Sequence, residues 1–325
     1  MSSHTTTSPS SCDEQQTVAT IRAMLRQEEL GYSSSTDDYL SRLPDENTGD
    51  DAVVDAACRS AMARWFHQIA DWCRYSSETV EIALSCLDRY SSTPAGREDI
   101  LLDRSRYQLA AMTALYTTVK IHEQEVMTPS LVSRLSRGAH SAEDVEAMES
   151  RMLTAIRWRV NPPTAASFAR SILDLVELPG DHPADRETLL GFVGCQIETV
   201  VGEYGFCTVR ASSIAYACVL NAIDSFLVDD GALAADLGTA IGKAIRIEGG
   251  DDASSSIVEL RTRIYDLLNG TGDDDTDGVP ITTTTTKNNS FTEKSSSSVG
   301  ADSKPADRTD IDSSPRTVAT SVAQR

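Results

Sequence analysis

No run of apolar residues in this chain approaches the roughly 18 residues that a membrane-spanning helix needs. Basic residues are also scarce: 29 lysines and arginines stand against 49 aspartates and glutamates, so the formal charge of the 325 residues is −20. Such a chain repels phosphate backbones, and we expect no binding of nucleic acid by simple electrostatics. The first residues have neither the basic nor the apolar segment of a targeting signal. We therefore expect a soluble protein of the nucleus and cytoplasm with no membrane partner.

Signs of catalysis are absent as well. The seven cysteines, at positions 12, 58, 73, 86, 195, 207 and 218, form no C-x-x-C pair, so we interpret them as reduced thiols. The histidines show no ligand spacing such as His-x-x-x-His, and the chain contains neither a Gly-rich loop after a strand nor a G-x-S-x-G motif. We expect no enzymatic activity, no cofactor and no metal site.

Composition divides the chain into a folded middle and two polar ends. Residues 1–16 are rich in Ser and Thr, and residues 270–325 contain no Leu, Trp or Tyr, with a Thr run at 282–286. Segments of this kind cannot bury enough apolar surface to offset chain entropy, so both ends are predicted to be disordered. A helix at 18–30 and an acidic linker are predicted within residues 17–52.

Helical periodicity accounts for the middle of the chain, where no strand pattern competes with it. In the first half, apolar residues recur at helical spacing in 62–73, 79–90, 107–119, 128–135 and 141–156. The third of these segments is apolar almost all round, which predicts a helix enclosed by others. Thr128-Pro129 indicates an N-cap followed by Pro at N1, and Ser141-x-x-Asp144 resembles a capping box.

A second set of helices is predicted beyond the break at Asn161-Pro162-Pro163. Its segments are 168–176, 190–204, 215–227, 233–245 and 257–267. The predicted fold class is all-α, with two tandem five-helix domains at 53–162 and 163–269, an extra N-terminal helix and disordered tails. Trp65 and Trp72 are interpreted as core residues.

Lys120 and Glu149 are charges in unexpected places, because each lies on the apolar stripe of its predicted helix. A charge on a core-facing stripe is costly unless it is paired or kept for a partner. One interpretation is an internal salt bridge that fixes the register of two helices. The other is a binding surface, and a single pair can do both.

The motifs around these charges resemble the N-terminal box of cyclins. They are Arg59-x-x-Met62-x-x-Trp65-Phe66, Leu87-Asp88-Arg89-Tyr90, Lys120-x-x-Glu123, Met148-Glu149-x-x-Met152-Leu153 and Pro163-Thr164. Residues 53–162 would then be an N-terminal cyclin box and 163–269 a C-terminal cyclin-like domain, the latter similar only in helix number and hydrophobicity. The leading helix, with Gln27-Glu28-Glu29, is most similar to D-type cyclins of plants, algae and diatoms.

The resemblance implies a regulatory subunit that binds and activates a cyclin-dependent Ser/Thr protein kinase in cell-cycle control. Lys120 and Glu149 match the family residues that contact the kinase around its αC helix. The full set that the resemblance assigns to kinase binding is Lys120, Ile121, Glu123, Glu149, Leu153, Trp158 and Val160.

The resemblance also implies a docking patch for substrates or inhibitors on the first helix of the box. The matching residues are Cys58, Ala61, Met62 and Trp65. Because Cys and Ala are smaller than the usual residues, we expect a weakened or altered patch. Two alternatives to a cell-cycle cyclin stay open: a transcription-associated or nutrient-signalling cyclin, and a helical scaffold with a cyclin-like fold that binds no kinase.

Overall fold

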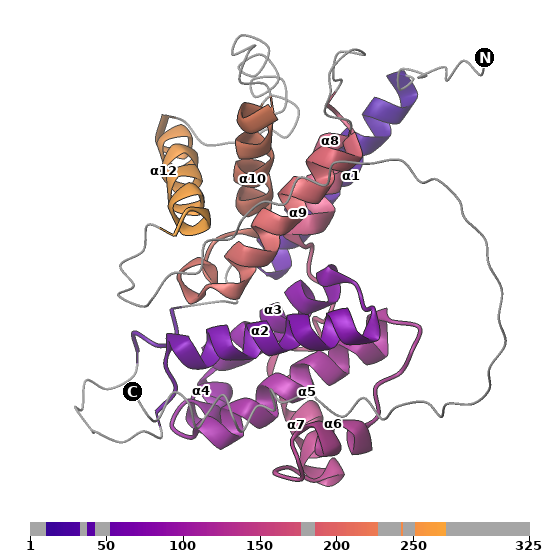
Figure 1. The fold of residues 1–325 in the computed structure, drawn as a ribbon, viewed down its shortest axis with the longest axis vertical. Coiled ribbons are helices and arrows are strands. Elements are labelled where there is room, and N and C mark those ends of the chain that lie inside the picture. Colours follow the sequence, from indigo (N-terminus) through magenta and orange to yellow (C-terminus); the bar gives the residue numbers. More distant parts are fainter. Residues whose placement is uncertain are drawn as a thin grey trace, which may run out of the picture.

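The computed structural model describes residues 11–32, 38–42, 53–176, 186–226, 242 and 251–270, and the secondary structure of these residues is helical. No strand occurs within these ranges. Two groups of helices are stacked, with α2–α7 in one group and α8–α12 in the other (Figure 1). Helix α1 runs alongside α8 and α9, although it precedes all the others in the sequence (Figure 1).

The first group and the helix before it have the following bounds: α1 Ser11–Gly31, α2 Ala56–Cys73, α3 Ser77–Ser92, α4 Pro94–Ile100, α5 Arg104–His122, α6 Pro129–Leu135 and α7 Ala142–Ala155. The second group contains α8 Ala165–Leu173, α9 Arg186–Gly202, the 3-10 turn η1 Tyr204–Phe206, α10 Ala211–Phe226 and α12 Asp251–Leu268. The predicted helix at 233–245 lies outside the described residues.

Helix α5 is the centre of the first group. Its side chains are buried on every face between Tyr107 and Val119, as its nearly unbroken apolar sequence predicted. Helices α2, α3, α4, α6 and α7 all contact it. Local capping follows the sequence closely: Thr128 caps α6 with Pro129 at N1, and Ser141 and Asp144 form the capping box of α7.

The second group has a separate hydrophobic core built around α10. Helices α8, α9 and α12 contact α10, and Ile214, Val219 and Ile223 lie in this core. Ile21 of α1 is buried in the same core, so the N-terminal helix packs on the second group of helices rather than on the first. The two cores are joined by the Pro162-Pro163 hinge.

Two elements differ from the sequence-based expectation. Helix α1 begins at Ser11, whereas a helix from 18 was predicted after a disordered stretch. An acidic residue close to a helix N-terminus interacts favourably with the helix dipole, and Glu14 stands in the first turn. Helix α4 was missed because it spans only two turns. It is fixed by the Thr93 cap and by Gly96, where a Cβ atom would lie 2.0 Å from the carbonyl oxygen of Tyr90.

Membrane-spanning helices, metal-binding groups and disulfide bonds are all absent from the residues that the structure describes. None of the helices there is both long and apolar enough to cross a membrane. No group of three or more His, Cys, Asp or Glu side chains is placed to hold a metal ion within those ranges. Every cysteine whose side chain is described is a free thiol.

A buried ion pair joins the two groups of helices. Arg59 of α2 donates to both carboxylate oxygens of Asp88 of α3, over 2.8 Å each, and the two side chains are only 3% and 5% exposed. The remaining guanidinium nitrogen donates to the carbonyl oxygens of Val201 and Gly202 at the end of α9, over 3.1 and 3.0 Å. These carbonyls are left unbonded within a helix end, and Arg59 satisfies them.

The short segment 38–42 is bound at the same junction. The hydroxyl of Tyr39 donates to Asp88 over 3.0 Å, and its ring packs edge-to-face on Tyr204 with 5.1 Å between centroids. Tyr204 in turn donates to Asp38 over 2.7 Å. The Asp38-Tyr39-Leu40 segment therefore ties the linker after α1 to both groups of helices.

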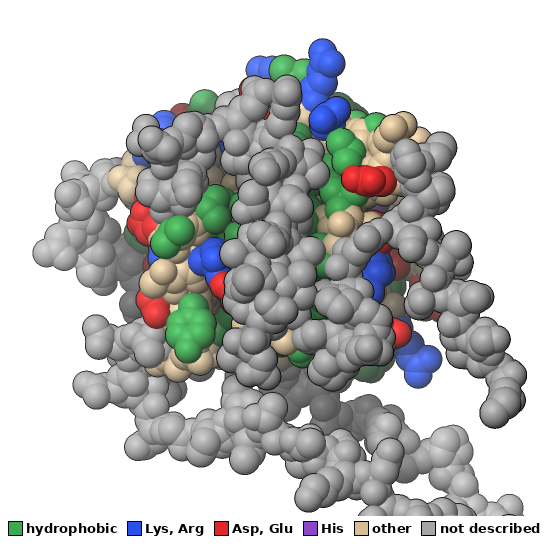
Figure 2. Space-filling view, turned by 90° about the horizontal axis from the view of Figure 1, so that it is seen from above, with side chains coloured by type: hydrophobic (Ala, Val, Ile, Leu, Met, Phe, Trp, Pro, Cys, Tyr) green, Lys and Arg blue, Asp and Glu red, His purple; other side chains and the backbone are tan. Residues whose placement is uncertain are grey.

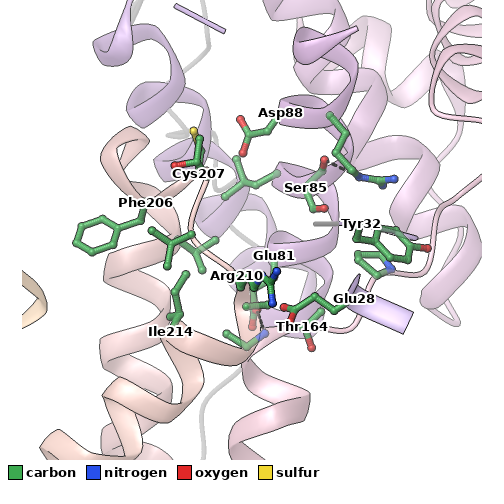
Figure 3. A pocket seen from close by; sticks show the side chains of 18 of the residues that line it. Glu28, Tyr32, Glu81, Ser85, Asp88, Thr164, Phe206, Cys207, Arg210 and Ile214 are labelled. Atoms are coloured by element: carbon green, nitrogen blue, oxygen red, sulfur yellow. Dashed lines mark hydrogen bonds between the residues drawn. The ribbon is translucent and has the colours of Figure 1, made fainter. Parts of the chain in front are cut away.

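Glu81 of α3 provides a further link, at the start of α8. Its carboxylate accepts from the backbone N–H groups of Ala165 and Ala166, over 2.8 and 3.3 Å. Burial raises the pKa of Glu81 to about 8, and the charge of Glu78 adds to the rise, against the opposing effect of the two N–H groups. Figure 3 shows Glu81 at a cavity of about 130 Å³ between the two groups, which Thr164 also lines.

We expect the Arg59–Asp88 pair to dominate the response of the fold to mutation. Asp88→Ala leaves the guanidinium buried and unpaired, which costs about 3–5 kcal/mol of unfolding free energy. Urea denaturation measures this loss. The control is Asp174→Ala, which removes an exposed ion pair with Arg186 and should cost less than about 1 kcal/mol. Equal shifts in the two variants would contradict the assigned role of the pair.

The raised pKa of Glu81 makes stability depend on pH. An unfolded Glu titrates near pH 4.3, whereas the folded group holds its proton up to about pH 8. The folded state therefore binds more protons within this window, so the unfolding free energy falls as pH rises from about 6 to 8.5. Urea midpoints of Glu81→Gln should fall less over this range than those of the parent. Glu146→Gln, which changes an exposed glutamate, should behave like the parent. A parent midpoint that does not change with pH would refute the prediction.

Candidate partner-binding surface

The two charges singled out in the sequence meet at the contact between α5 and α7. Nζ of Lys120 lies 2.5 Å from Oε1 of Glu149, and the hydroxyl of Thr117 donates to the same oxygen over 3.2 Å. Nζ also lies 5.0 Å from the ring centroid of Tyr116, within the range of a cation–π contact. The predicted internal salt bridge is therefore present.

The pair is not enclosed by the fold. The side chain of Lys120 is 40% exposed and that of Glu149 is 13% exposed. Partial burial lowers the pKa of Lys120, but the hydrogen bond and charge of Glu149, together with Tyr116, outweigh it, and the net pKa is raised. Lys120 is thus protonated at neutral pH and offers further N–H donors toward solvent.

Large apolar side chains are exposed next to Lys120 and just after α7. Trp158, just after α7, is 69% exposed, and Ile121, next to Lys120, is 46% exposed. Leu153 lies beneath the surface at 6% exposure, and Val160 is half-buried. Large exposed apolar groups beside a fixed charge pair are typical of a surface that a partner covers.

Backbone strain accompanies the exposed Trp158. Helix α7 ends in a Schellman motif, with the N–H of Trp158 bonded to Leu153 over 2.8 Å and that of Arg157 bonded to Thr154 over 3.2 Å. Glycine normally occupies the left-handed position of this motif. Here Arg157 has φ 57° and Trp158 has φ 59°, so two side-chain-bearing residues adopt a conformation that costs about 1–2 kcal/mol each. Such strain is concentrated at functional sites.

Glu123 and Val160, which also belong to the predicted contact set, have partners within the fold. The carboxylate of Glu123 accepts from the backbone N–H of Ser76 over 2.9 Å and from the hydroxyl of Thr79, so it caps the start of α3. Nε2 of His122 lies 3.2 Å from the carbonyl oxygen of Val160. The end of α5 is therefore attached to the segment that carries Trp158.

The predicted docking patch is not an open surface. Ala61, Met62 and Trp65 are 5%, 6% and 4% exposed, and only Cys58 is half-buried. These side chains pack into the first hydrophobic core and α2 also contacts α9 and η1, so docking at the expected weakened or altered patch stays a prediction. Trp65 is a core residue as predicted. Trp72, predicted to be core, is 65% exposed in the last turn of α2.

Several residues of this region were not identified from the sequence. Tyr116 and Thr117 were counted only as apolar or enclosed positions, although both contact the charge pair. The Arg59–Asp88 pair was quoted as part of two motifs without a role. It could have been found by the argument used for Lys120 and Glu149, since it too consists of opposite charges on apolar stripes.

Where the structure describes it, the face of the second group of helices that Figure 2 shows carries charges of both signs. Figure 2 shows basic, acidic and hydrophobic side chains interspersed among the coloured residues of that face. Within the described residues shown there, no continuous basic area is seen. The Lys120–Glu149 region is consequently the stronger candidate for specific recognition.

Comparison with known proteins finds similarity to cyclins in a family model and in curated relatives. The family described as "Cyclin, N-terminal domain" matches residues 20–161. Cyclin-D4-2 of Arabidopsis thaliana is 26% identical over 262 residues, which cover 75% of this chain and 82% of that protein. Cyclin-A3-2 of Oryza sativa subsp. japonica is 25% identical over 225 residues, covering 67% of this chain and 54% of that protein.

A solved structure shares the fold. The viral cyclin from herpesvirus saimiri matches with a TM-score of 0.54 at 14% sequence identity, over 76% of this chain and 97% of that one. At that identity the match concerns the fold alone. The matched residues include both the Arg59–Asp88 and the Lys120–Glu149 motifs, so over this region the chain is similar to the N-terminal domain of cyclins.

Proposed function

We propose that this protein is a cyclin, that it is the regulatory subunit of a cyclin-dependent Ser/Thr protein kinase and that it acts in cell-cycle control. The observation that carries the proposal is the paired Lys120 and Glu149, accessible to solvent and flanked by exposed Ile121 and Trp158. The proposal is supported by the contact of Lys120 with Glu149 between α5 and α7 and by the attachment of the segment after Trp158 to the end of α5 through His122 and Val160.

The geometry suits recognition of a helix from the partner. Lys120 is held by Glu149 and Tyr116, and its remaining N–H donors would bond the unpaired carbonyl oxygens at the end of a helix of the partner. Trp158 and Ile121 would cover the apolar side of the same helix. A kinase is active only when its αC helix is swung in and its Glu pairs with the β3 Lys. A cyclin that binds this arrangement alone shifts the equilibrium toward it by its differential affinity.

In this proposal the cyclin performs no chemistry. Its contribution is binding energy, and the ATP site and the catalytic groups belong to the kinase. We place the complex in the nucleus and cytoplasm. The sequence contains no cluster of Lys and Arg that would act as its own import signal, so entry together with the partner fits best.

We expect Lys120→Ala and Glu149→Ala each to weaken kinase binding about 30-fold or more. Truncating one member of a desolvated interface pair costs about 2–5 kcal/mol, and 1.4 kcal/mol corresponds to tenfold. The full chain, tagged, is used to recover kinases from cells of its own source. A cyclin-dependent kinase identified by mass spectrometry is then purified and titrated with the parent and both variants.

The matched control is Arg261→Ala, which removes another partly exposed cation that is ion-paired, to Asp224 on the second group of helices. It should leave the kinase affinity unchanged, and circular dichroism should report the same helix content for all four proteins. Recovery of no kinase by the folded parent would reject the proposed function and favour a scaffold role. Equal affinities in all variants would reject the assigned surface.

Trp158 should show opposite effects on stability and on binding. Trp158→Gly removes the left-handed strain and should raise the unfolding free energy by up to about 1 kcal/mol. The same change removes an exposed aromatic anchor, whose loss at an interface typically costs 2 kcal/mol or more, so we expect kinase affinity to fall by roughly 30-fold. Urea denaturation and titration with the kinase measure the two effects. A variant that is destabilised, or that binds as the parent does, would contradict this assignment.

A further inference from the structure

Residues 27–32, at and just after the end of α1, make four contacts with three parts of the molecule. Nε2 of Gln27 donates to the carbonyl oxygen of Asn161 over 2.9 Å, and the carboxylate of Glu28 accepts from the backbone N–H of Ser212 over 3.0 Å. The ring of Tyr32 lies under the guanidinium of Arg89 of α3, 4.8 Å from its centroid. Figure 3 shows Glu28 and Tyr32 on one side of the cavity between the groups, opposite Phe206 and Ile214.

The fourth contact of this turn is to Arg159. Its guanidinium donates to the carbonyl oxygen of Gly31 over 2.7 Å. With the bond from Gln27 to Asn161, α1 therefore holds both residues that flank Val160. On the other side, the ring of His122 at the end of α5 contacts the carbonyl of Val160 itself. The segment 159–161 is thus held between α1 and α5.

This segment directly follows the strained residues Arg157 and Trp158. The side chain of Trp158 is 69% exposed and its backbone is strained. Packing around this side chain therefore does not hold the turn in place. The turn is defined by its Schellman bonds at one end and by the contacts of residues 159–161 at the other. Loss of the second attachment would leave Trp158 free to sample conformations with negative φ, which are lower in energy.

We propose that Gln27 of α1 and Arg159 are positioning residues that hold the Trp158 turn in the conformation that the kinase recognises. Neither needs to touch the partner for this role. The N-terminal helix, which belongs to the second hydrophobic core, would in this way set the geometry of a surface on the first. The expected effect on kinase binding rests on the proposed function. The effect on the conformation of Trp158 can be measured on the protein alone.

The test uses the full chain labelled with fluorinated tryptophan, which gives one fluorine resonance for each of the three tryptophans. Trp158→Phe assigns the resonance of interest. Gln27→Met retains side-chain length and helix propensity but removes the N–H donor to Asn161. Gln16→Met makes the same change at an exposed position of the same helix and is the matched control. Arg159→Met tests the second attachment.

We expect Gln27→Met and Arg159→Met to move or broaden the Trp158 resonance while the resonances of Trp65 and Trp72 and the melting temperature stay as in the parent. Kinase affinity should fall about fivefold in both, and Gln16→Met should match the parent in each measurement. An unchanged Trp158 resonance overturns the proposal. So does a change in all three resonances with a loss of thermal stability, which would indicate a structural role only. If the parent binds no kinase, the proposed function fails, and the fluorine spectra still decide whether α1 positions Trp158.

Discussion

The Arg59–Asp88 ion pair is the contact on which the arrangement of the two groups of helices depends. It joins α2 to α3, reaches the end of α9 through Arg59 and anchors Tyr39 of the linker through Asp88. A buried pair of this kind adds little net stability compared with apolar side chains, because desolvation of both charges is costly. The pair instead selects one arrangement of the helices, because any packing of α9 or the linker that leaves either charge unpaired is strongly disfavoured.

A fixed junction matters because the candidate binding surface is assembled from both sides of it. Lys120 and Glu149 are positioned by α5 and α7 in the first core, whereas the turn with Trp158 is also attached to α1, whose Ile21 belongs to the second core. The surface breaks local rules in two ways: it exposes large apolar side chains, and it places Arg157 and Trp158 where glycine is preferred. Strain of this kind persists only where several contacts determine the backbone.

Much of the first group of helices followed from the sequence, because α2, α3, α5 and α7 carry strong apolar stripes and local caps. Helix α4 did not, since two turns with a single buried large side chain, Ile100, leave almost no periodic signal. The exposure of the predicted docking patch could not be read from the sequence for another reason. Periodicity shows that Ala61, Met62 and Trp65 share a face, but whether that face is open depends on what packs over it.

The sequence by itself determined the all-α class and marked Lys120 and Glu149 as charges that need a partner, because these depend on residue spacing within helices and on the cost of a charge on an apolar stripe. The cyclin resemblance came from the motifs around the two charges. Tertiary structure alone decided that Arg59 and Asp88 clasp the two groups, that Glu81 caps α8 and that Gln27 reaches Asn161, 134 residues away. Contacts between residues so far apart in the sequence depend on how the helices pack in three dimensions. The residue pattern of a single helix does not predict which distant segment packs against it.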